Sequence, residues 1–155
     1  MASQTNALRL RLPVRKTAQL KRTGASLGLS AGSVPDLIRE VTRGFAYQAL
    51  VDFGTNSGVS LQSLAETIGI PERTLARRSV SGRLSPEESE RLLRVSSIFE
   101  KAVALFEGDV QAAVHWLTAP KRALGNQTPF EYARTEIGAR EVENLIGRLE
   151  HGVFS

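Results

Sequence analysis

The chain has 155 residues, enough for one ordinary hydrophobic core or for two small ones that share a connecting helix. It contains no cysteine, which excludes disulfides and thiol catalysis, and its two histidines lie too far apart to suggest a metal site. No apolar run could span a bilayer, and basic residues interrupt every candidate signal core, so we expect a soluble, cytoplasmic protein without a metal or cofactor.

The net charge of +4 is unevenly distributed along the chain. Residues 1–33 carry six basic and no acidic side chains, residues 34–95 carry eight of each sign, and residues 96–155 carry six basic against eight acidic ones. This asymmetry is typical of a chain whose N-terminal part binds a polyanion and whose C-terminal part binds a protein. The alternative is a basic tail that is merely solvated.

Residues 1–32 are rich in Ser, Thr, Gly, Ala and basic side chains, without apolar periodicity. We expect a flexible basic arm, which could follow DNA phosphates because Lys and Arg release the counterions condensed on them. Ser33 then predicts the start of a first helix, and Gly44 interrupts the pattern. Helical spacing resumes up to Gly54, and residues 55–58 are expected to form a loop. The apolar positions of these two segments are Val34, Leu37, Ile38, Val41, Phe45, Ala49, Leu50 and Phe53.

Residues 33–84 contain the layout of a helix-turn-helix, in which the second helix enters the DNA major groove. Leu64 and Ile68 lie on the inward face of a short first helix, and Ala65 is small where the second helix would cross. Gly69 fits the turn, because a positive φ is cheap only for glycine.

The second helix of this unit is predicted to begin at Pro71 or Glu72. Three side chains project from its outer face, where arginine can read guanine and threonine can contact a base edge or a phosphate: Arg73, Thr74 and Arg77. Two further arginines, Arg78 and Arg83, better suit contacts with the DNA backbone. In this layout an apolar residue is expected near the position of Arg78, where it would close the second helix onto the core. Arginine there indicates either a short helix or a basic residue held for phosphate, which leaves the helix length open. A solvated basic helix face is the alternative interpretation.

Residues 85–107 are predicted to form the longest helix, which connects the two halves of the chain and could serve dimerisation. A capping box with proline at the first helical position opens it at Ser85. Its apolar arc is wide enough to pack on the helix-turn-helix on one side and on the C-terminal part or a second subunit on the other. The inward residues are Leu92, Leu93, Val95, Ser96, Phe99, Ala102, Val103 and Phe106.

Residues 108–155 read as three short helices. Asp109 caps the first, a capping box begins the second at Thr128, and Gly138 is expected to break the second. The third stops at Gly152. Trp116 is predicted to anchor the core of this module. The expected fold is therefore all-α, with a helix-turn-helix bundle joined by a long helix to a small three-helix domain.

Three motifs in the last third of the chain are similar to those of a known protein family. They are W-L-x-x-P at 116–120, A-L-G-x-x-T-P at 123–129, and G-A-x-x-V-x-x-L-I-x-R-L-x-x-G-V at 138–153. The module resembles the C-terminal toxin-binding domain of the Xre/MbcA/ParS antitoxins, and the helix-turn-helix is similar to that of Xre-type regulators. The resemblance implies a type II antitoxin that represses its own operon, forms a dimer or larger oligomer, and blocks the active-site entrance of a RES-type toxin, which consumes NAD⁺.

Contacts with such a partner must come from side chains that the core does not need. We expect cationic residues off the apolar stripes and the chain end with its carboxylate to serve, because aromatic residues and arginine often dominate interfaces. The candidates are Lys121, Arg122, Arg140, Arg148, His151, Val153, Phe154 and Ser155. Simple fraying of the final residues is the alternative.

Two other function classes are open. The chain could be a stand-alone helix-turn-helix regulator whose C-terminal module serves dimerisation or effector sensing. An enzyme is not expected, because the sequence lacks a GxSxG elbow, a glycine-rich phosphate loop, a metal cluster and a cysteine nucleophile.

Overall fold

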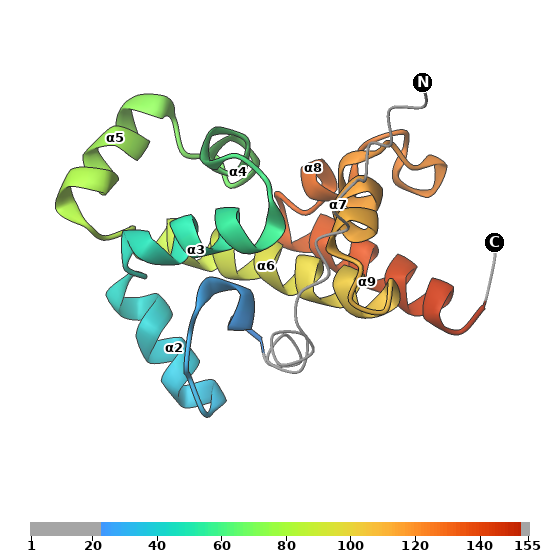
Figure 1. Cartoon of the computed structure of the whole chain (residues 1–155), viewed down its shortest axis with the longest axis horizontal. Coiled ribbons are helices and arrows are strands. Elements are labelled where there is room, and N and C mark those ends of the chain that lie inside the picture. The colour runs from blue at the N-terminus through green and yellow to red at the C-terminus, as the bar shows by residue number, and fades with distance from the viewer. Residues whose placement is uncertain (1–22, 153–155) are drawn as a thin grey trace, which may run out of the picture.

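The computed structural model describes residues 23–152, and the regular elements in this range are all helical, which confirms the predicted all-α class (Figure 1). Two short 3-10 helices, η1 and η2, accompany the α-helices. The helices are η1 Ala25–Leu27, α2 Val34–Arg43, α3 Tyr47–Ser57, α4 Leu61–Thr67, α5 Glu72–Ser81, α6 Pro86–Leu105, α7 Val110–Thr118, η2 Arg122–Leu124, α8 Pro129–Tyr132 and α9 Glu136–Glu150.

Side-chain caps begin most of these helices where the sequence predicts. Ser33 and Asp109 each accept a hydrogen bond from the backbone N–H three residues on. Ser85 and Thr128 form complete capping boxes with Glu88 and Glu131, so that two backbone N–H groups are satisfied at each start. Each cap contributes about 1 kcal/mol to helix stability, and because the capping residues are specific types, these helix starts can be predicted from the sequence.

The long helix α6 lies at the centre of the molecule and packs against α2, α3, α7 and α9 (Figure 1). Phe99 on α6 meets Phe53 on α3 edge to face, with ring centroids 5.3 Å apart. The buried residues form one apolar cluster that continues from the helix-turn-helix into the C-terminal helices. Ile98, absent from the predicted inward set, is fully buried, whereas Leu93 and Phe106 are only half-buried.

Polar contacts also connect the helix-turn-helix half of the chain with the C-terminal half. The Arg134 guanidinium, between α8 and α9, donates to the Glu66 carbonyl at the end of α4 at 2.5 Å. Arg94 of α6 donates to the Arg134 carbonyl at 3.3 Å. Because carbonyls at a helix end lack partners within the helix, Arg134 acts as a C-terminal cap for α4.

The predicted loop at 55–58 is wrong, because residues 55–57 belong to α3. The helix ends only at Gly58, whose φ of 72° and whose N–H, bonded to the Gly54 carbonyl, form a left-handed cap. The Ser57 hydroxyl donates back to the Phe53 carbonyl at 2.7 Å. The hydroxyls of Thr55 and Ser57 are satisfied by carbonyls of the helix itself, and the Asn56 amide donates to the Ser26 carbonyl.

The prediction that Gly138 breaks a helix is also wrong. The break lies between α8 and α9, and Gly138 sits in the first turn of α9 with its N–H bonded to the Thr135 hydroxyl. A Cβ at this position would stand 1.7 Å from the Tyr132 carbonyl oxygen. Glycine is therefore required by the close approach of α9 to the end of α8, not by a helix end.

The expected flexible arm at 1–32 is corrected for the part that the structure describes. Ser26 and Leu27 are buried against α3 and α6. The Glu100 carboxylate of α6 accepts hydrogen bonds from the Gly24 N–H at 3.1 Å, the Ser26 N–H at 3.2 Å and the Ser26 hydroxyl at 2.6 Å. The attachment therefore depends on the buried side chain of Leu27 and on the carboxylate of Glu100, which are far apart in the chain. Residues 1–22 lie outside the described range.

Candidate interaction surfaces

The predicted helix-turn-helix is formed by α4 and α5. Leu64, Ala65 and Ile68 of the first helix are buried, and Gly69 in the turn has a φ of 73°. The Ile70 N–H bonds to the Ala65 carbonyl at 2.8 Å, which fixes the turn before α5 begins. The turn geometry therefore agrees with the reason for expecting glycine at this position.

Helix α5 presents an exposed outer face at one end of the molecule, the left end in Figure 1. Arg73 and Arg77 are exposed and lie four residues apart, so that they share this face. Thr74 is half-buried, and its hydroxyl is 3.4 Å from an Arg77 guanidinium nitrogen. Val80 lies on the same face, three residues beyond Arg77, and is 90% exposed. The sequence prediction omitted Val80, although its spacing from Arg73 and Arg77 places it there.

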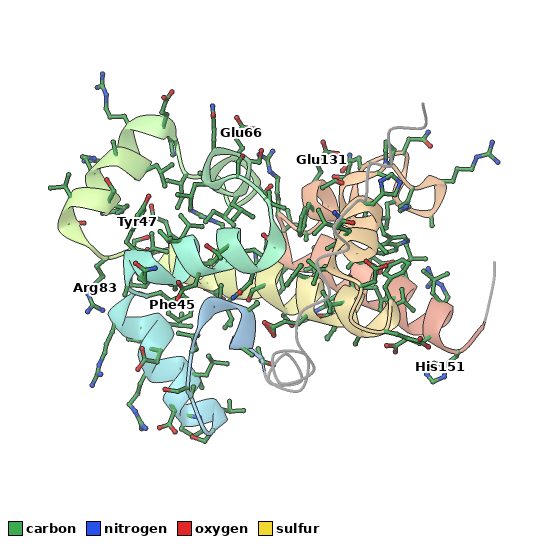
Figure 2. The ribbon with its side chains drawn as sticks, in the orientation of Figure 1. Phe45, Tyr47, Glu66, Arg83, Glu131 and His151 are labelled. Carbon is green, nitrogen blue, oxygen red and sulfur yellow. The ribbon has the colours of Figure 1, made fainter. Side chains whose placement is uncertain are left out.

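The other two predicted DNA contacts have partners within the chain. Arg78 pairs with Glu88 of α6 at 2.8 Å. The Arg83 guanidinium donates to the Gly44 carbonyl at 2.7 Å, beside Phe45 and Tyr47, where the exit of α5 meets the junction of α2 and α3 (Figure 2). These contacts attach α5 to the helices behind it.

The electrostatics of Glu88 reflect this arrangement. Burial by itself would raise the pKa of the Glu88 carboxyl, but hydrogen bonds from the Ser85 N–H and from Arg78, together with the Arg78 charge, outweigh burial and lower it. Glu88 is therefore an ionised, nearly buried carboxylate with Arg78 as its cationic partner in the described part of the chain.

The candidate partner contacts lie on the C-terminal half. Lys121 is half-buried with its ammonium 5.2 Å from the centroid of the Trp116 ring, and desolvation lowers the pKa of Lys121. Trp116 itself is half-buried at the edge of the core, so it is not the central anchor that the sequence predicted. Arg122 is exposed on η2, and Arg140 is exposed and pairs with Glu136 at 2.7 Å.

Helix α9 carries the remaining described candidates toward the right end in Figure 1, opposite α5. Arg148 is half-buried, and its Nε has no acceptor among residues 23–152. His151 follows the helix and is exposed (Figure 2). The structure brings η2 against α9, so Lys121 and Arg122 lie on the element next to that helix. Val153, Phe154 and Ser155 lie outside the described residues.

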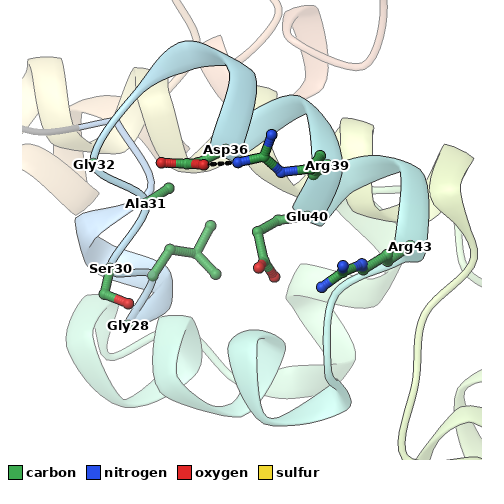
Figure 3. Close-up of a pocket in the computed structure, with 9 residues that line it drawn as sticks. Gly28, Ser30, Ala31, Gly32, Asp36, Arg39, Glu40 and Arg43 are labelled. Carbon is green, nitrogen blue, oxygen red and sulfur yellow. Dashed lines mark hydrogen bonds and ion pairs between the residues drawn. The ribbon is translucent and has the colours of Figure 1, made fainter.

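One surface hollow has a lining of mixed charge. It measures about 420 Å³ and lies between residues 28–32 and α2, and an ion pair between Asp36 and Arg39 stands at its side (Figure 3). Glu40 and Arg43 add one charge of each sign, so the lining has no preference for a ligand of one charge. Within the described range, no cluster of three or more His, Asp and Glu side chains could hold a metal ion.

None of the helices in residues 23–152 combines the length and the apolar character needed to cross a membrane.

Two family models match the chain in succession. Residues 36–97 match the antitoxin Xre-like helix-turn-helix domain, and residues 101–152 match the antitoxin Xre/MbcA/ParS C-terminal toxin-binding domain. The match to the first covers the arginine face of α5, and the match to the second covers the candidate partner contacts on η2 and α9.

Whole-chain relatives agree with both matches. The chain is 39% identical to a protein named antitoxin Xre of Yersinia enterocolitica, over 92% of this chain and 95% of that protein. It is 34% identical to an antitoxin Xre of Photorhabdus laumondii, over 84% and 88% of the two chains. An antitoxin Xre of Pseudomonas putida is 34% identical over 72% of this chain and 69% of its own.

Proposed function

Since the chain belongs to the Xre antitoxin family, we propose that it is a type II antitoxin that inhibits a RES-type, NAD-degrading toxin and represses its own operon. Residues 33–84 bind operator DNA, residues 85–107 connect and help to dimerise the chain, and residues 108–155 bind the toxin. The observation that supports this proposal most is that the exposed arginine face on α5 and the candidate toxin contacts on η2 and α9 lie toward opposite ends of one molecule (Figure 1).

In this proposal the DNA contacts are centred on the outer face of α5. Arg73 and Arg77 read base edges, because a guanidinium can donate two hydrogen bonds to guanine, and Thr74 contacts a base edge or a phosphate. Arg83 is exposed apart from its bond to Gly44, and its charge supports a phosphate contact. Operators of this type are read by dimers. Val34 and Ile38 of α2, 70% and 60% exposed, are apolar surface available to a second copy.

Replacing Arg73 or Arg77 with alanine is expected to lower operator affinity by roughly 10- to 100-fold, because each bidentate base contact contributes about 1–3 kcal/mol of discrimination. Binding is measured on a duplex from the promoter upstream of the gene, at one stated salt concentration. Arg122→Ala, an exposed arginine on the other half, is the matched control and should leave affinity unchanged. Unchanged affinity in both α5 variants would show that the recognition helix is wrongly assigned.

The proposed inhibition is occlusion, in which this chain does no chemistry. Lys121, Arg122, Arg140, Arg148 and His151 form the toxin-facing surface together with Val153, Phe154 and Ser155. Arg148 is a candidate for a strong contact, because it is half-buried on α9 and forms no ion pair within residues 23–152. A guanidinium without an ion pair gains more from a carboxylate on another protein than one already paired.

Replacing Arg148 with alanine, or stopping the chain after Gly152, is expected to weaken toxin binding by at least about tenfold, as for a residue that dominates an interface. The readout is NAD⁺ consumption by the toxin encoded next to this gene, titrated with the antitoxin. Arg39→Ala, an exposed arginine on α2, is the control. Full inhibition by both altered chains would remove these residues from the toxin surface. Failure of the wild-type chain to bind that toxin at all would favour a stand-alone regulator.

A further inference from the structure

Helix α5 is attached to the rest of the protein by few side chains. Within residues 23–152, none of its ten residues is fully buried, although it is the helix assigned to the DNA major groove. Leu75 is half-buried against the core, and Arg78, three residues on, is the other inward attachment. Backbone hydrogen bonds hold the residues just after the helix, from the Tyr47 N–H to the Gly82 carbonyl at 2.8 Å and from the Leu84 N–H to the Phe45 carbonyl at 2.9 Å. Together with the Ile70–Ala65 bond before α5, those bonds hold the backbone at both ends of the helix, and Leu75 and Arg78 are the inward side chains between them.

The geometry of the Arg78–Glu88 contact can fix the rotation of α5 about its own axis. The Arg78 Nε donates to one carboxylate oxygen of Glu88 at 2.8 Å, and a second guanidinium nitrogen lies 3.5 Å from the other oxygen. A planar fork on a carboxylate defines an orientation as well as a distance. The side chain of Glu88 is only 7% exposed, and its Oε1 also accepts from the Ser85 N–H at 2.8 Å. The carboxylate is thus held on α6, and α6 is held by the core.

We infer that Arg78 is a positioning residue for DNA recognition, which sets the direction of Arg73 and Arg77 through Glu88 and does not itself bind the DNA backbone. This inference rests on the proposed operator binding by α5. Arg73 and Arg77 are exposed and on the outer face, whereas the Arg78 fork is engaged with a nearly buried carboxylate on the opposite side. A base contact requires the guanidinium to meet both acceptors of guanine, so a small rotation of α5 would cost specificity.

The decisive variant is Glu88→Gln, because the two roles of Arg78 predict opposite signs. Glutamine can preserve the capping box at the start of α6, but it removes the negative charge and replaces one of the two acceptor oxygens that face the Arg78 fork. If Arg78 bound a phosphate, removing Glu88 would release it and take a repelling charge away from DNA, so affinity would rise. If Arg78 positions α5, operator affinity falls by about tenfold while affinity for a scrambled duplex does not fall. Glu87→Gln, on the same turn but exposed, is the matched control and should not weaken operator binding.

The measurement is the affinity of the full-length chain for the upstream promoter duplex and for a scrambled duplex, with folding checked by circular dichroism. Arg78→Lys is the second variant, and it serves as the test of the inference if Glu88→Gln does not fold. A lysine could still meet a phosphate but cannot reproduce the fork, so we expect it to lower the ratio of specific to non-specific affinity. Unchanged or higher operator affinity in Glu88→Gln, or an unchanged ratio in Arg78→Lys, would overturn the inference. If the wild-type chain did not prefer the promoter duplex, the proposed function would fail instead.

Discussion

Gly138→Ala is expected to lower the free energy of unfolding by about 3 kcal/mol or more, at the upper end of what overpacking costs. An added Cβ would lie 1.7 Å from the carbonyl oxygen of Tyr132 and 2.8 Å from its carbonyl carbon. Both are backbone atoms, so no rotamer change can relieve the clash, and α9 would have to move away from α8. Chemical denaturation followed by circular dichroism measures the loss.

The same helix supplies the control for this prediction. Gly147 lies further along α9, and a Cβ built there meets no atom within 4 Å. Because glycine in a helix interior is less stable than alanine by about 0.5–1 kcal/mol, Gly147→Ala should leave stability unchanged or raise it slightly. Toxin inhibition should fall with Gly138→Ala only, since α9 carries the proposed toxin contacts. Equal destabilisation by both substitutions would contradict the close-approach explanation.

Glu100 is expected to make the protein less stable as the pH rises from about 4.5 to 7. Desolvation by burial raises the pKa of its carboxyl from 4.5 to about 7, and the hydrogen bonds from Ser26 and Gly24 only partly oppose this. Over that interval the unfolded chain has released a proton that the folded chain retains, so the stability from this group is complete below pH 4.5 and is lost as the pH approaches 7. The loss corresponds to about 3 kcal/mol.

Glu100→Gln tests this pH dependence, because glutamine does not titrate. The unfolding free energy of the wild type is measured at pH 5, 6, 7 and 8, and the variant should lose most of the decline seen in the wild type. Glu141→Gln, an exposed carboxylate on α9, should keep the wild-type slope. Identical slopes for Glu100→Gln and the wild type would show that Glu100 is already ionised at pH 5.

Much of the helical layout could be predicted because its signals are local. Ser33, Ser85 and Thr128 cap helices through bonds to residues three positions away, and the left-handed Gly69 makes the turn after α4 by its own conformation. Interactions of such short range are present in any window of the sequence that contains them. The same holds for the helical spacing of Arg73 and Arg77, which placed them on one exposed face.

Several of the predictions that failed concern contacts between separate elements of the structure. Gly138 was interpreted from its residue type alone, whereas its role depends on the carbonyl of Tyr132 in the preceding helix. Residues 24–27 were interpreted as part of an arm because no local pattern shows that Glu100, 74 to 76 positions away, accepts their hydrogen bonds. Trp116 was expected in the core, but its ring packs at the edge beneath Lys121.

The sequence by itself determined the all-α class, most helix starts, the helix-turn-helix and the family motifs, because capping, helical periodicity and motif spacing are properties of neighbouring residues. Tertiary structure alone decided which charged side chains are free to meet a partner. Arg78 and Arg73 are the same residue type five positions apart on one helix, and only the nearly buried Glu88 on α6 distinguishes an arginine that is paired internally from one that is exposed.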